Sequence, residues 1–174
     1  MPKSPYDLNK LTSERYLKLY NRAYGVEQVI FRFATVYGPR QRLSPEWHPV
    51  VMEFCTKLLK RAAPIINGTG EQTRDFIFVE DIVGALVKVL SVEEAVNETM
   101  ILGTNTETSI NELYNLICDI LNVKIKPKRG PKRFGDIPRM RYDCRKVERI
   151  LGWKAKTSLA NGITKILVLL SDAD

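Results

Sequence analysis

The 174-residue sequence has one histidine and three cysteines, and this scarcity limits the metal and disulfide chemistry that it could support. Cys55, Cys118 and Cys144 lie far apart, and none belongs to a C-x-x-C pair. Neither a disulfide framework nor a thiolate zinc site is indicated, and a reducing compartment fits best. His48 stands without clustered acids or thiols, so we expect no metal site. A surface position is favoured for His48 over a substrate contact.

Long hydrophobic runs are also lacking, and the longest extends only from Ile166 to Leu170. A bilayer crossing needs roughly 20 apolar residues. No basic segment followed by an apolar one precedes Pro2, as a secretory leader would require. We therefore expect a cytoplasmic protein that neither spans a membrane nor is exported. The hydrophobic share of 44% and the charged share of 27% are typical of an ordinary globular domain.

The sequence contains no glycine-rich turn of the kind that binds a dinucleotide pyrophosphate through backbone N–H groups. The stretch GTGEQT at Gly68 lacks a third glycine and runs into a predicted strand. The stretch GTNTETSI at Gly103 follows a strand and precedes a helix, but it has a single glycine. Both stretches are interpreted as ordinary turns.

Positive charge is concentrated in one part of the chain. Between Lys124 and Lys156 there are thirteen lysines and arginines against three acidic residues, whereas the formal net charge of the whole chain is +7. Such a block can form a solvated face, a nucleic-acid surface or a pocket for a phosphate ligand. Nucleic-acid binding is disfavoured because the block has few aromatic residues and no helix-turn-helix or zinc pattern.

Helical and strand patterns alternate along the chain, which favours the α/β class. A helix over 5–24 is indicated by the S-x-x-D box of Ser4 and Asp7 and by Pro5 in the first turn. Further helices are expected over 50–60, 80–90, 110–121 and 159–170, with a short one ending at residue 151. Strands are expected over 29–33 and 100–102, with two more within 64–79, and long loops over 36–49 and 124–141. Ser109, Asp143 and Asp81 are interpreted as helix caps.

Tyr6 and Lys10 share one face of the first expected helix. A free tyrosine titrates near pH 10, so a phenolate that acts as a base at neutral pH needs a stabilising cation and a positive helix end. Lys10 and the helix N-terminus could supply both. The spacing alone is weak, since Tyr142 and Lys146 repeat it, and taken alone it favours an exposed surface pair.

Six ordered stretches of the sequence favour a functional role for Tyr6 and Lys10 over a surface pair. They are PKSPYDLNKLTSERY, FRFATVYGPRQ, INGTGEQTRDFIFVEDIVGAL, TETSINELYNLI, RFGDIPRMRYD and ILGWKAKTSL. In order and spacing they resemble the latter half of the extended short-chain dehydrogenase/reductase family, in its nucleotide-sugar epimerase and dehydratase branch of the UDP-glucose 4-epimerase type.

The resemblance implies roles for individual residues. Tyr6 would be the base that removes the proton of the sugar 4-hydroxyl, and Lys10 would hold the nicotinamide ribose of NAD. Phe33 and Thr35 would lie near nicotinamide, and Thr35 would also touch the substrate. Family members usually have asparagine at position 35, so one substrate hydrogen bond would be weaker here.

The same resemblance assigns a UDP-sugar site. Arg74 and Arg133 would hold the diphosphate, Asp136 would lie near the uridine ribose, and Ile65 and Asn67 would flank the uracil. Guanidinium groups suit phosphate oxygens, and a carboxylate accepts hydrogen bonds from ribose hydroxyls. For Arg74 the alternative is a salt bridge to Asp75 or Glu71. An aromatic side chain is common at position 67 in the family, so base stacking would be weaker here.

The resemblance also implies an organisation. Residues 1–40 would be the C-terminal part of a doubly wound NAD-binding Rossmann domain, and 41–174 mainly a small mixed α/β sugar-nucleotide-binding domain, with 99–103 returning to the Rossmann sheet. The chain would then be the C-terminal half of such an enzyme and inactive alone. Its exposed strand 29–33 and first helix would invite self-association, with a homodimer formed through the Tyr6–Tyr24 helix. A 4,6-dehydratase half and a non-catalytic UDP-sugar-binding module remain the alternatives.

Overall fold

The computed structural model describes residues 2, 4–44, 48–133 and 135–172, so part of the loop expected over 36–49 lies outside the described residues. The helices are α1 (Pro5–Tyr24), α2 (Val50–Leu59), α3 (Val79–Val89), the 3₁₀ helix η1 (Glu93–Ala95), α4 (Ile110–Leu121), α5 (Arg145–Leu151) and α6 (Leu159–Ser171). The strands are β1 (Ile30–Phe33), β2 (Thr35–Tyr37), β3 (Ile65–Asn67), β4 (Thr73–Arg74), β5 (Phe76–Phe78), β6 (Thr99–Leu102), β7 (Thr108–Ser109) and β8 (Lys128–Gly130).

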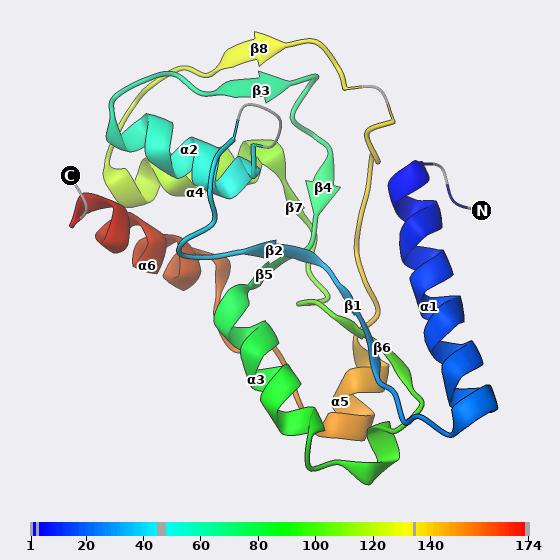
Figure 1. Ribbon diagram of the computed structural model, residues 1–174. Coiled ribbons are helices and arrows are strands. Elements are labelled where there is room, and N and C mark those ends of the chain that lie inside the picture. The colour runs from blue at the N-terminus through cyan, green and yellow to red at the C-terminus, as the bar shows by residue number, and fades with distance from the viewer. Residues whose placement is uncertain (1, 3, 45–47, 134, 173–174) are drawn as a thin grey trace.

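The strands join in pairs that are distant in sequence. β1 pairs with β6, β2 with β5 and β3 with β8, all in parallel, while β4 and β7 are antiparallel. Parallel pairs require crossover connections, and helices supply much of their length here. Figure 1 shows β3, β8, α2 and α4 at one end of the molecule and β1, β6, α3 and α5 at the other. The α/β class predicted from the sequence is confirmed.

Local sequence signals account for the helix ends. Ser4 Oγ accepts a hydrogen bond from the Asp7 backbone N–H at 3.1 Å, and Gly25 ends α1 in the left-handed conformation with φ of +68°. The start of α4 has a complete capping box, in which Ser109 Oγ accepts from Glu112 N and Glu112 Oε2 accepts from Ser109 N. These bonds satisfy N–H groups that the helix itself leaves without partners.

Two of the predicted caps are wrong in detail. Asp143 is not the N-cap of α5; Cys144 has that position, although Asp143 Oδ1 accepts from the Arg145 backbone N–H at 3.0 Å. Asp81 lies inside the first turn of α3, and its carboxylate accepts from the backbone N–H groups of Lys156 and Thr157 at 3.1 and 3.0 Å. It therefore fastens the chain before α6 to α3 rather than capping a helix.

Four short strands were not expected. The strand β2 lies where residues 36 and 37 were expected to be loop, β8 lies within the basic stretch expected to be loop, β7 precedes α4 where no strand was expected, and the 64–79 segment forms three strands rather than two. Each has only two or three residues and pairs with a strand far along the chain. Such elements are set by long-range partners, which local periodicity does not reveal.

Buried apolar residues form two clusters. The first gathers the inner faces of α2, α4 and α6 around β5, with Phe54, Phe78 and Ile117 fully inaccessible. The second gathers α3, α5 and β6, with Leu151 and Trp153 among its buried members. Each cluster combines a residue before position 40, Tyr37 in the first and Ala34 in the second, with many residues after it. The division into domains at residue 40 stays a prediction.

Helix α1 differs from the others because none of its residues is buried. Its exposed apolar side chains are Tyr6, Leu8, Tyr16, Leu17, Leu19, Tyr20 and Tyr24. An ion pair between Glu14 and Arg32 of β1, at 2.6 Å, fastens the helix to the strand. Within β1, Phe33 is 45% exposed but Ile30 is buried, so the expectation of a bare strand holds only in part.

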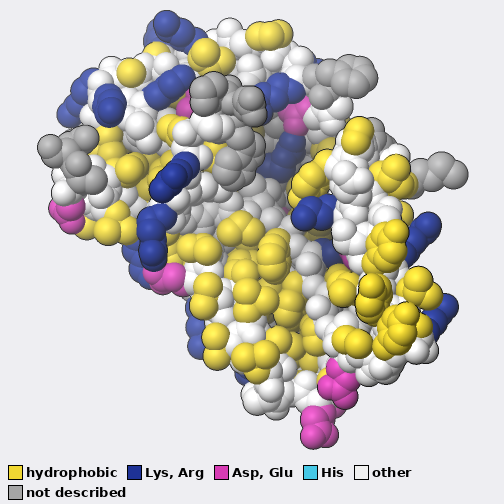
Figure 2. Space-filling view, in the orientation of Figure 1, with side chains coloured by type: hydrophobic (Ala, Val, Ile, Leu, Met, Phe, Trp, Pro, Cys, Tyr) yellow, Lys and Arg dark blue, Asp and Glu magenta, His cyan; other side chains and the backbone are white. Residues whose placement is uncertain are grey.

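A second exposed apolar surface, not anticipated from the sequence, lies on α3. Val83, Leu86, Val87 and Leu90 follow helical spacing and are all exposed. Figure 2 shows hydrophobic side chains gathered over α1 and over α3 with its neighbouring strands. Within the described residues, no helix has both the length and the apolar character to cross a membrane.

Candidate functional site

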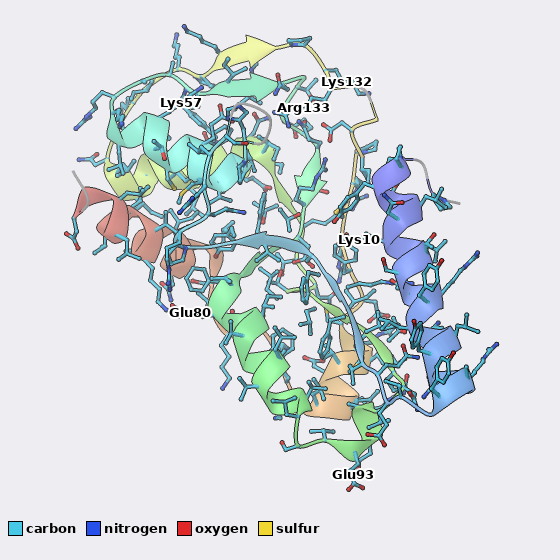
Figure 3. The ribbon with its side chains drawn as sticks, in the orientation of Figure 1. Lys10, Lys57, Glu80, Glu93, Lys132 and Arg133 are labelled. Carbon is cyan, nitrogen blue, oxygen red and sulfur yellow. The ribbon has the colours of Figure 1, made fainter. Side chains whose placement is uncertain are left out.

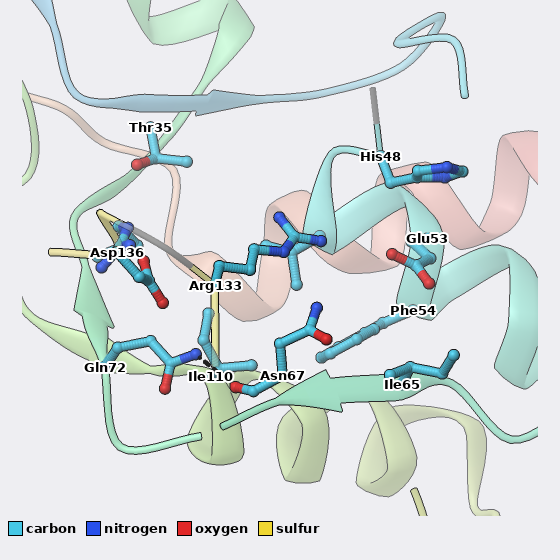
Figure 4. A pocket seen from close by; sticks show the side chains of 12 residues that line it. Thr35, His48, Glu53, Phe54, Ile65, Asn67, Gln72, Ile110, Arg133 and Asp136 are labelled. Atoms are coloured by element: carbon cyan, nitrogen blue, oxygen red, sulfur yellow. Dashed lines mark hydrogen bonds and ion pairs between the residues drawn. The ribbon is translucent and has the colours of Figure 1, made fainter. Parts of the chain in front are cut away.

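A cavity of about 330 Å³ opens between α2, β3, β4 and the loop that follows β8. Its lining residues are Thr35, His48, Val50, Glu53, Phe54, Ile65, Asn67, Gln72, Arg74, Ile110, Arg133 and Asp136. Figure 4 shows Asp136 and Gln72 on one side, Glu53, Phe54 and Ile65 on the other, and Arg133 between them. All six residues assigned to the substrate from the sequence line this single cavity.

Arg74 occupies one wall of the cavity, at the end of β4. It forms an ion pair with Asp136, and the two side chains are only 18% and 16% exposed. Its Nη1 also donates to the carbonyl oxygens of Thr73 and Ile137, both at 2.7 Å. The salt bridges to Asp75 or Glu71 considered from the sequence are therefore not those it makes. Arg74 instead holds the loop after β8 against β4.

The residues behind Arg74 reinforce this connection. Thr73 Oγ1 donates to Glu107 at 2.9 Å, and Arg139 donates to both Glu107 oxygens at 3.1 and 2.5 Å. Hydrogen bonds from the Arg139 guanidinium and from Thr73 lower the pKa of the Glu107 carboxyl. The Met140 backbone N–H donates to Thr73 Oγ1 at 3.2 Å. The loop that carries Asp136 is thus fixed on both sides.

Arg133 and Asn67 meet at the middle of the cavity. With the Asn67 side-chain amide oriented so that its oxygen faces Arg133, it accepts from Nε and Nη2 at 3.1 and 3.2 Å. Gln72 Nε2 donates to the Asn67 backbone carbonyl at 2.9 Å. Gly130 is paired with Asn67 across β3 and β8, and a Cβ at position 130 would lie 2.4 Å from the end of the Asn67 side-chain amide that faces away from Arg133. The absence of a side chain there makes room for the Asn67 amide.

Thr35 is positioned through a buried acid. The Thr35 backbone N–H donates to the Asp75 carbonyl at 2.8 Å. The Asp75 side chain is fully buried and accepts from Thr104 N, Thr104 Oγ1 and Asn105 N at 2.9, 2.7 and 3.1 Å. Three donors satisfy this carboxylate, as burial of a charge requires. Asp75 therefore joins the strand of Thr35 to the turn that follows β6.

The end of the cavity near α2 includes residues that the sequence did not single out. Phe54 and Ile110 contribute apolar surface, and Glu53 contributes a carboxylate from the first turn of α2. His48 is exposed, as expected, yet it also lines the cavity. Helical periodicity marks Phe54 as a core residue, but the cavity emerges only when β3 and the loop after β8 are placed.

Tyr6, Lys10 and Phe33 do not line the cavity. Lys10 Nζ lies 5.5 Å from the centroid of the Tyr6 ring, so the ammonium contacts the ring in a cation–π arrangement. Tyr6 is 68% exposed. Figure 3 shows Lys10 on α1 and Arg133 at the end of the molecule that carries β3 and β8. Tyr6, Lys10 and Phe33 therefore lie outside the cavity lining, whereas Thr35, which is assigned to both cofactor and substrate, belongs to it, and all these roles stay predictions.

Comparison with known proteins identifies the family. The sequence model of the GDP-mannose 4,6 dehydratase family matches residues 1–166. The chain belongs to this family. The prediction from the six ordered stretches, that the chain belongs to the extended short-chain dehydrogenase/reductases, is confirmed. The UDP-glucose 4-epimerase of Mycolicibacterium smegmatis is 36% identical to it over 164 residues, which cover 94% of this chain and 52% of the relative.

Solved structures share the fold. The UDP-glucose 4-epimerase of Thermotoga maritima, solved with UDP-glucose, superposes with a TM-score of 0.94 at 33% identity, over 99% of this chain and 55% of that one. The UDP-glucuronic acid 4-epimerase of Bacillus cereus, solved with UDP-glucuronic acid and NAD, gives a TM-score of 0.90 at 25% identity, over 100% and 55%. The chain thus spans about half the length of the relatives it matches.

Proposed function

We propose that this chain forms the sugar-nucleotide side of an NAD-dependent nucleotide-sugar 4-epimerase, of the type that interconverts UDP-glucose and UDP-galactose through a 4-keto intermediate. The observation that carries the proposal is the cavity in which Thr35, Ile65, Asn67, Arg133 and Asp136 come together. These residues are far apart in sequence, and their side chains match the parts of a UDP-sugar: guanidinium for phosphate, carboxylate for ribose hydroxyls and apolar surface for a base.

The diphosphate would lie against Arg133. Its guanidinium is exposed and held by the neutral Asn67 amide, so its charge is uncompensated at that contact. Arg74 already forms an ion pair with Asp136 and donates to two carbonyl oxygens. Its main contribution would therefore be to hold Asp136 and the loop in place, with the second charge adding to the local field.

Tyr6 would take the proton of the sugar 4-hydroxyl and return it after the 4-keto sugar has rotated to present its other face. The cation–π contact keeps the Lys10 ammonium beside the Tyr6 ring. Tyr6 lies in the first turn of α1, at the positive end of the helix dipole.

The residues described fit one end of NAD. Tyr6 and Phe33 present exposed aromatic rings and Lys10 presents an ammonium, which suit nicotinamide and its ribose. The sequence offers no glycine-rich turn for the pyrophosphate. When bound, NAD supplies the acceptor and donor of the C4 hydride. We therefore infer that these 174 residues, as a separate chain, bind sugar nucleotides but neither hold NAD nor turn over substrate.

Two alternative functions would use the same cavity. The matching family model is that of a 4,6-dehydratase, so a chain that helps to remove water from the sugar is the neighbouring activity. The separation of Tyr6 and Lys10 from the cavity lining favours a third candidate, a UDP-sugar-binding module that acts with a partner chain. We further infer that α1, with its exposed apolar side chains, forms a homodimer contact.

Calorimetric titration of the purified chain with UDP, UDP-glucose and NAD tests the proposal. UDP and UDP-glucose should bind and NAD should not. NMR spectra of the UDP-glucose mixture should show neither UDP-galactose nor a 4-keto-6-deoxy sugar. Absence of UDP binding would contradict the sugar-nucleotide site, whereas stoichiometric NAD with turnover would contradict the inactivity of the separate chain.

A further inference from the structure

Glu53 is a carboxylate in a cavity otherwise suited to an anion. It lies in the first turn of α2, and its side chain is 14% exposed. In Figure 4 it stands beside Phe54 and Ile65, on the opposite side of the cavity from Asp136, with Arg133 between the two acids. Lys57 Nζ donates to Glu53 Oε1 at 3.0 Å, which leaves Oε2 as the oxygen for a ligand among the contacts of the described residues.

Helix stability alone does not account for this placement. The pair of Glu53 and Lys57 has i,i+4 spacing, and such pairs stabilise a helix only slightly. An acid in a first turn also gains from the helix dipole, but an exposed acid would gain as much. Holding the carboxylate toward a cavity beside two apolar side chains removes water from it, which is unfavourable unless a donor replaces that water.

We propose that the Glu53 carboxylate accepts a hydrogen bond from the ring N–H of the nucleobase and thereby selects the base. The inference rests on the proposed function, which puts a nucleotide in this cavity with its phosphates at Arg133. The base would then lie at Ile65, which the resemblance assigns to it, and Phe54 and Glu53 stand on that same side of the cavity. Uracil and guanine carry a ring N–H on the edge used for base pairing. Cytosine and adenine carry there a bare nitrogen with a lone pair, which a carboxylate repels.

The expected selectivity follows from the chemistry of the carboxylate. A hydrogen bond to a charged group contributes about 1.5–3 kcal/mol, which corresponds to roughly a 10- to 150-fold ratio of dissociation constants. A site that is built to bind an N–H also rejects an analogue that lacks it, because its own group loses a partner. UDP should therefore bind at least about tenfold more tightly than CDP.

Titration of the chain with UDP, CDP and 3-methyl-UDP, whose ring N–H is replaced by N–CH₃, tests this assignment. The wild type should prefer UDP to both by roughly tenfold or more. Glu53→Gln should bring the UDP:CDP ratio close to one, because a side-chain amide can accept from uracil or donate to cytosine. Glu53→Ala should lower the affinity for UDP and also lose the preference.

Two control variants separate this role from a structural one. Lys57→Ala removes the ion-pair partner and leaves the carboxylate, so the preference for UDP should persist. Glu80→Gln removes a surface acid that is paired with Lys165 at 2.6 Å, and both affinities should stay unchanged. UDP binding by a wild type that does not distinguish CDP or 3-methyl-UDP, or an unchanged ratio in Glu53→Gln, would overturn the role of Glu53 alone. Failure of every nucleotide to bind would overturn the proposed function with it.

Discussion

Arg74 and Asp136, 62 residues apart in the sequence, form an ion pair that closes one wall of the cavity. The pair joins β4 to the loop after β8, and both side chains are largely shielded from solvent. Because Nη1 of Arg74 also binds two backbone carbonyl groups, this guanidinium is bound to the protein in three directions. The cavity is therefore shaped by an ion pair between residues that are distant in the sequence.

A double-mutant cycle on this pair should show strong coupling. Arg74→Ala and Asp136→Ala should each destabilise the chain, and the double variant should lose less than the sum of the two, with a coupling of about 0.5–3 kcal/mol. The reason is that each single change leaves a shielded charge without its partner. Urea unfolding of the four proteins measures the coupling. The exposed pair of Arg145 and Asp143 is the matched control, and it should show far weaker coupling. Equal couplings for both pairs would contradict the role given to Arg74.

Arg133→Ala should weaken UDP binding without destabilising the fold. Loss of a charge-assisted hydrogen bond of about 1.5–3 kcal/mol predicts a rise of roughly 10- to 150-fold in the dissociation constant. Unfolding should change little because Arg133 is exposed and its described partner, Asn67, is neutral. Calorimetric titration at two salt concentrations measures the effect. Lys128→Ala, an exposed change on β8, should leave the dissociation constant nearly unaltered, and a similar loss in both variants would point to a diffuse charge effect instead.

Gly162→Ala should destabilise the chain although alanine is the better helix former. A Cβ at position 162 of α6 would lie 2.2 Å from the Tyr37 hydroxyl and 2.8 Å from two ring carbons. The buried ring cannot yield freely, so overpacking of about 1–3 kcal/mol should exceed the gain in helix propensity. Gly84→Ala on α3 is the control, since its Cβ would approach nothing closer than 3.9 Å, and it should be neutral or stabilising by up to about 1 kcal/mol. Thermal unfolding distinguishes the two; a stabilised Gly162→Ala would refute the contact.

The capping box predicts a pH dependence. Hydrogen bonds from the Ser109 backbone and side chain lower the pKa of Glu112 in the folded chain. The unfolded chain then binds the proton more readily, so the stabilisation is present above the unfolded pKa of about 4.3 and is lost as the pH falls through the folded value. Glu112→Gln should lower the unfolding temperature at pH 7, and the difference from the wild type should shrink as the pH falls below about 4. Glu94→Gln, an exposed change on the 3₁₀ helix η1, is the control and should leave the unfolding temperature at pH 7 nearly unchanged. A difference that stays constant with pH would contradict the titration of Glu112.

Local signals in the sequence sufficed for the helices, whereas the six assigned cavity residues came from the family resemblance, and neither source revealed the cavity itself. Ser4, Gly25 and Ser109 specify helix ends through bonds within a few residues, and these ends were predicted correctly. Strands such as β2 and β8 depend on partners some 40 to 60 residues away, so short-range patterns missed them.

Glu53 and Arg74 show the same limit at the site. Glu53 fits a helical charge pattern, and its place in the cavity lining emerges only once the fold positions α2 and β3 around the cavity. Arg74 has two acids within three residues in the sequence, Glu71 and Asp75, yet it pairs with Asp136. Long-range packing selects the partner because it decides which carboxylate is placed within reach in a shielded position.

The tyrosine row on α1 carries the last prediction. Tyr16, Tyr20 and Tyr24 recur at i,i+4 spacing, all are more than half exposed, and the Tyr20 and Tyr24 ring centroids lie 5.4 Å apart. An aromatic row of this kind on a helix without buried residues is typical of an association surface. Tyr20→Glu should shift the chain from dimer to monomer in sedimentation velocity, because a carboxylate would be buried in the contact without a partner. Arg15→Glu, which changes charge on another face of α1, should leave the dimer intact. A monomeric wild type at high concentration, or dissociation by both changes, would show that the tyrosine row does not form the contact.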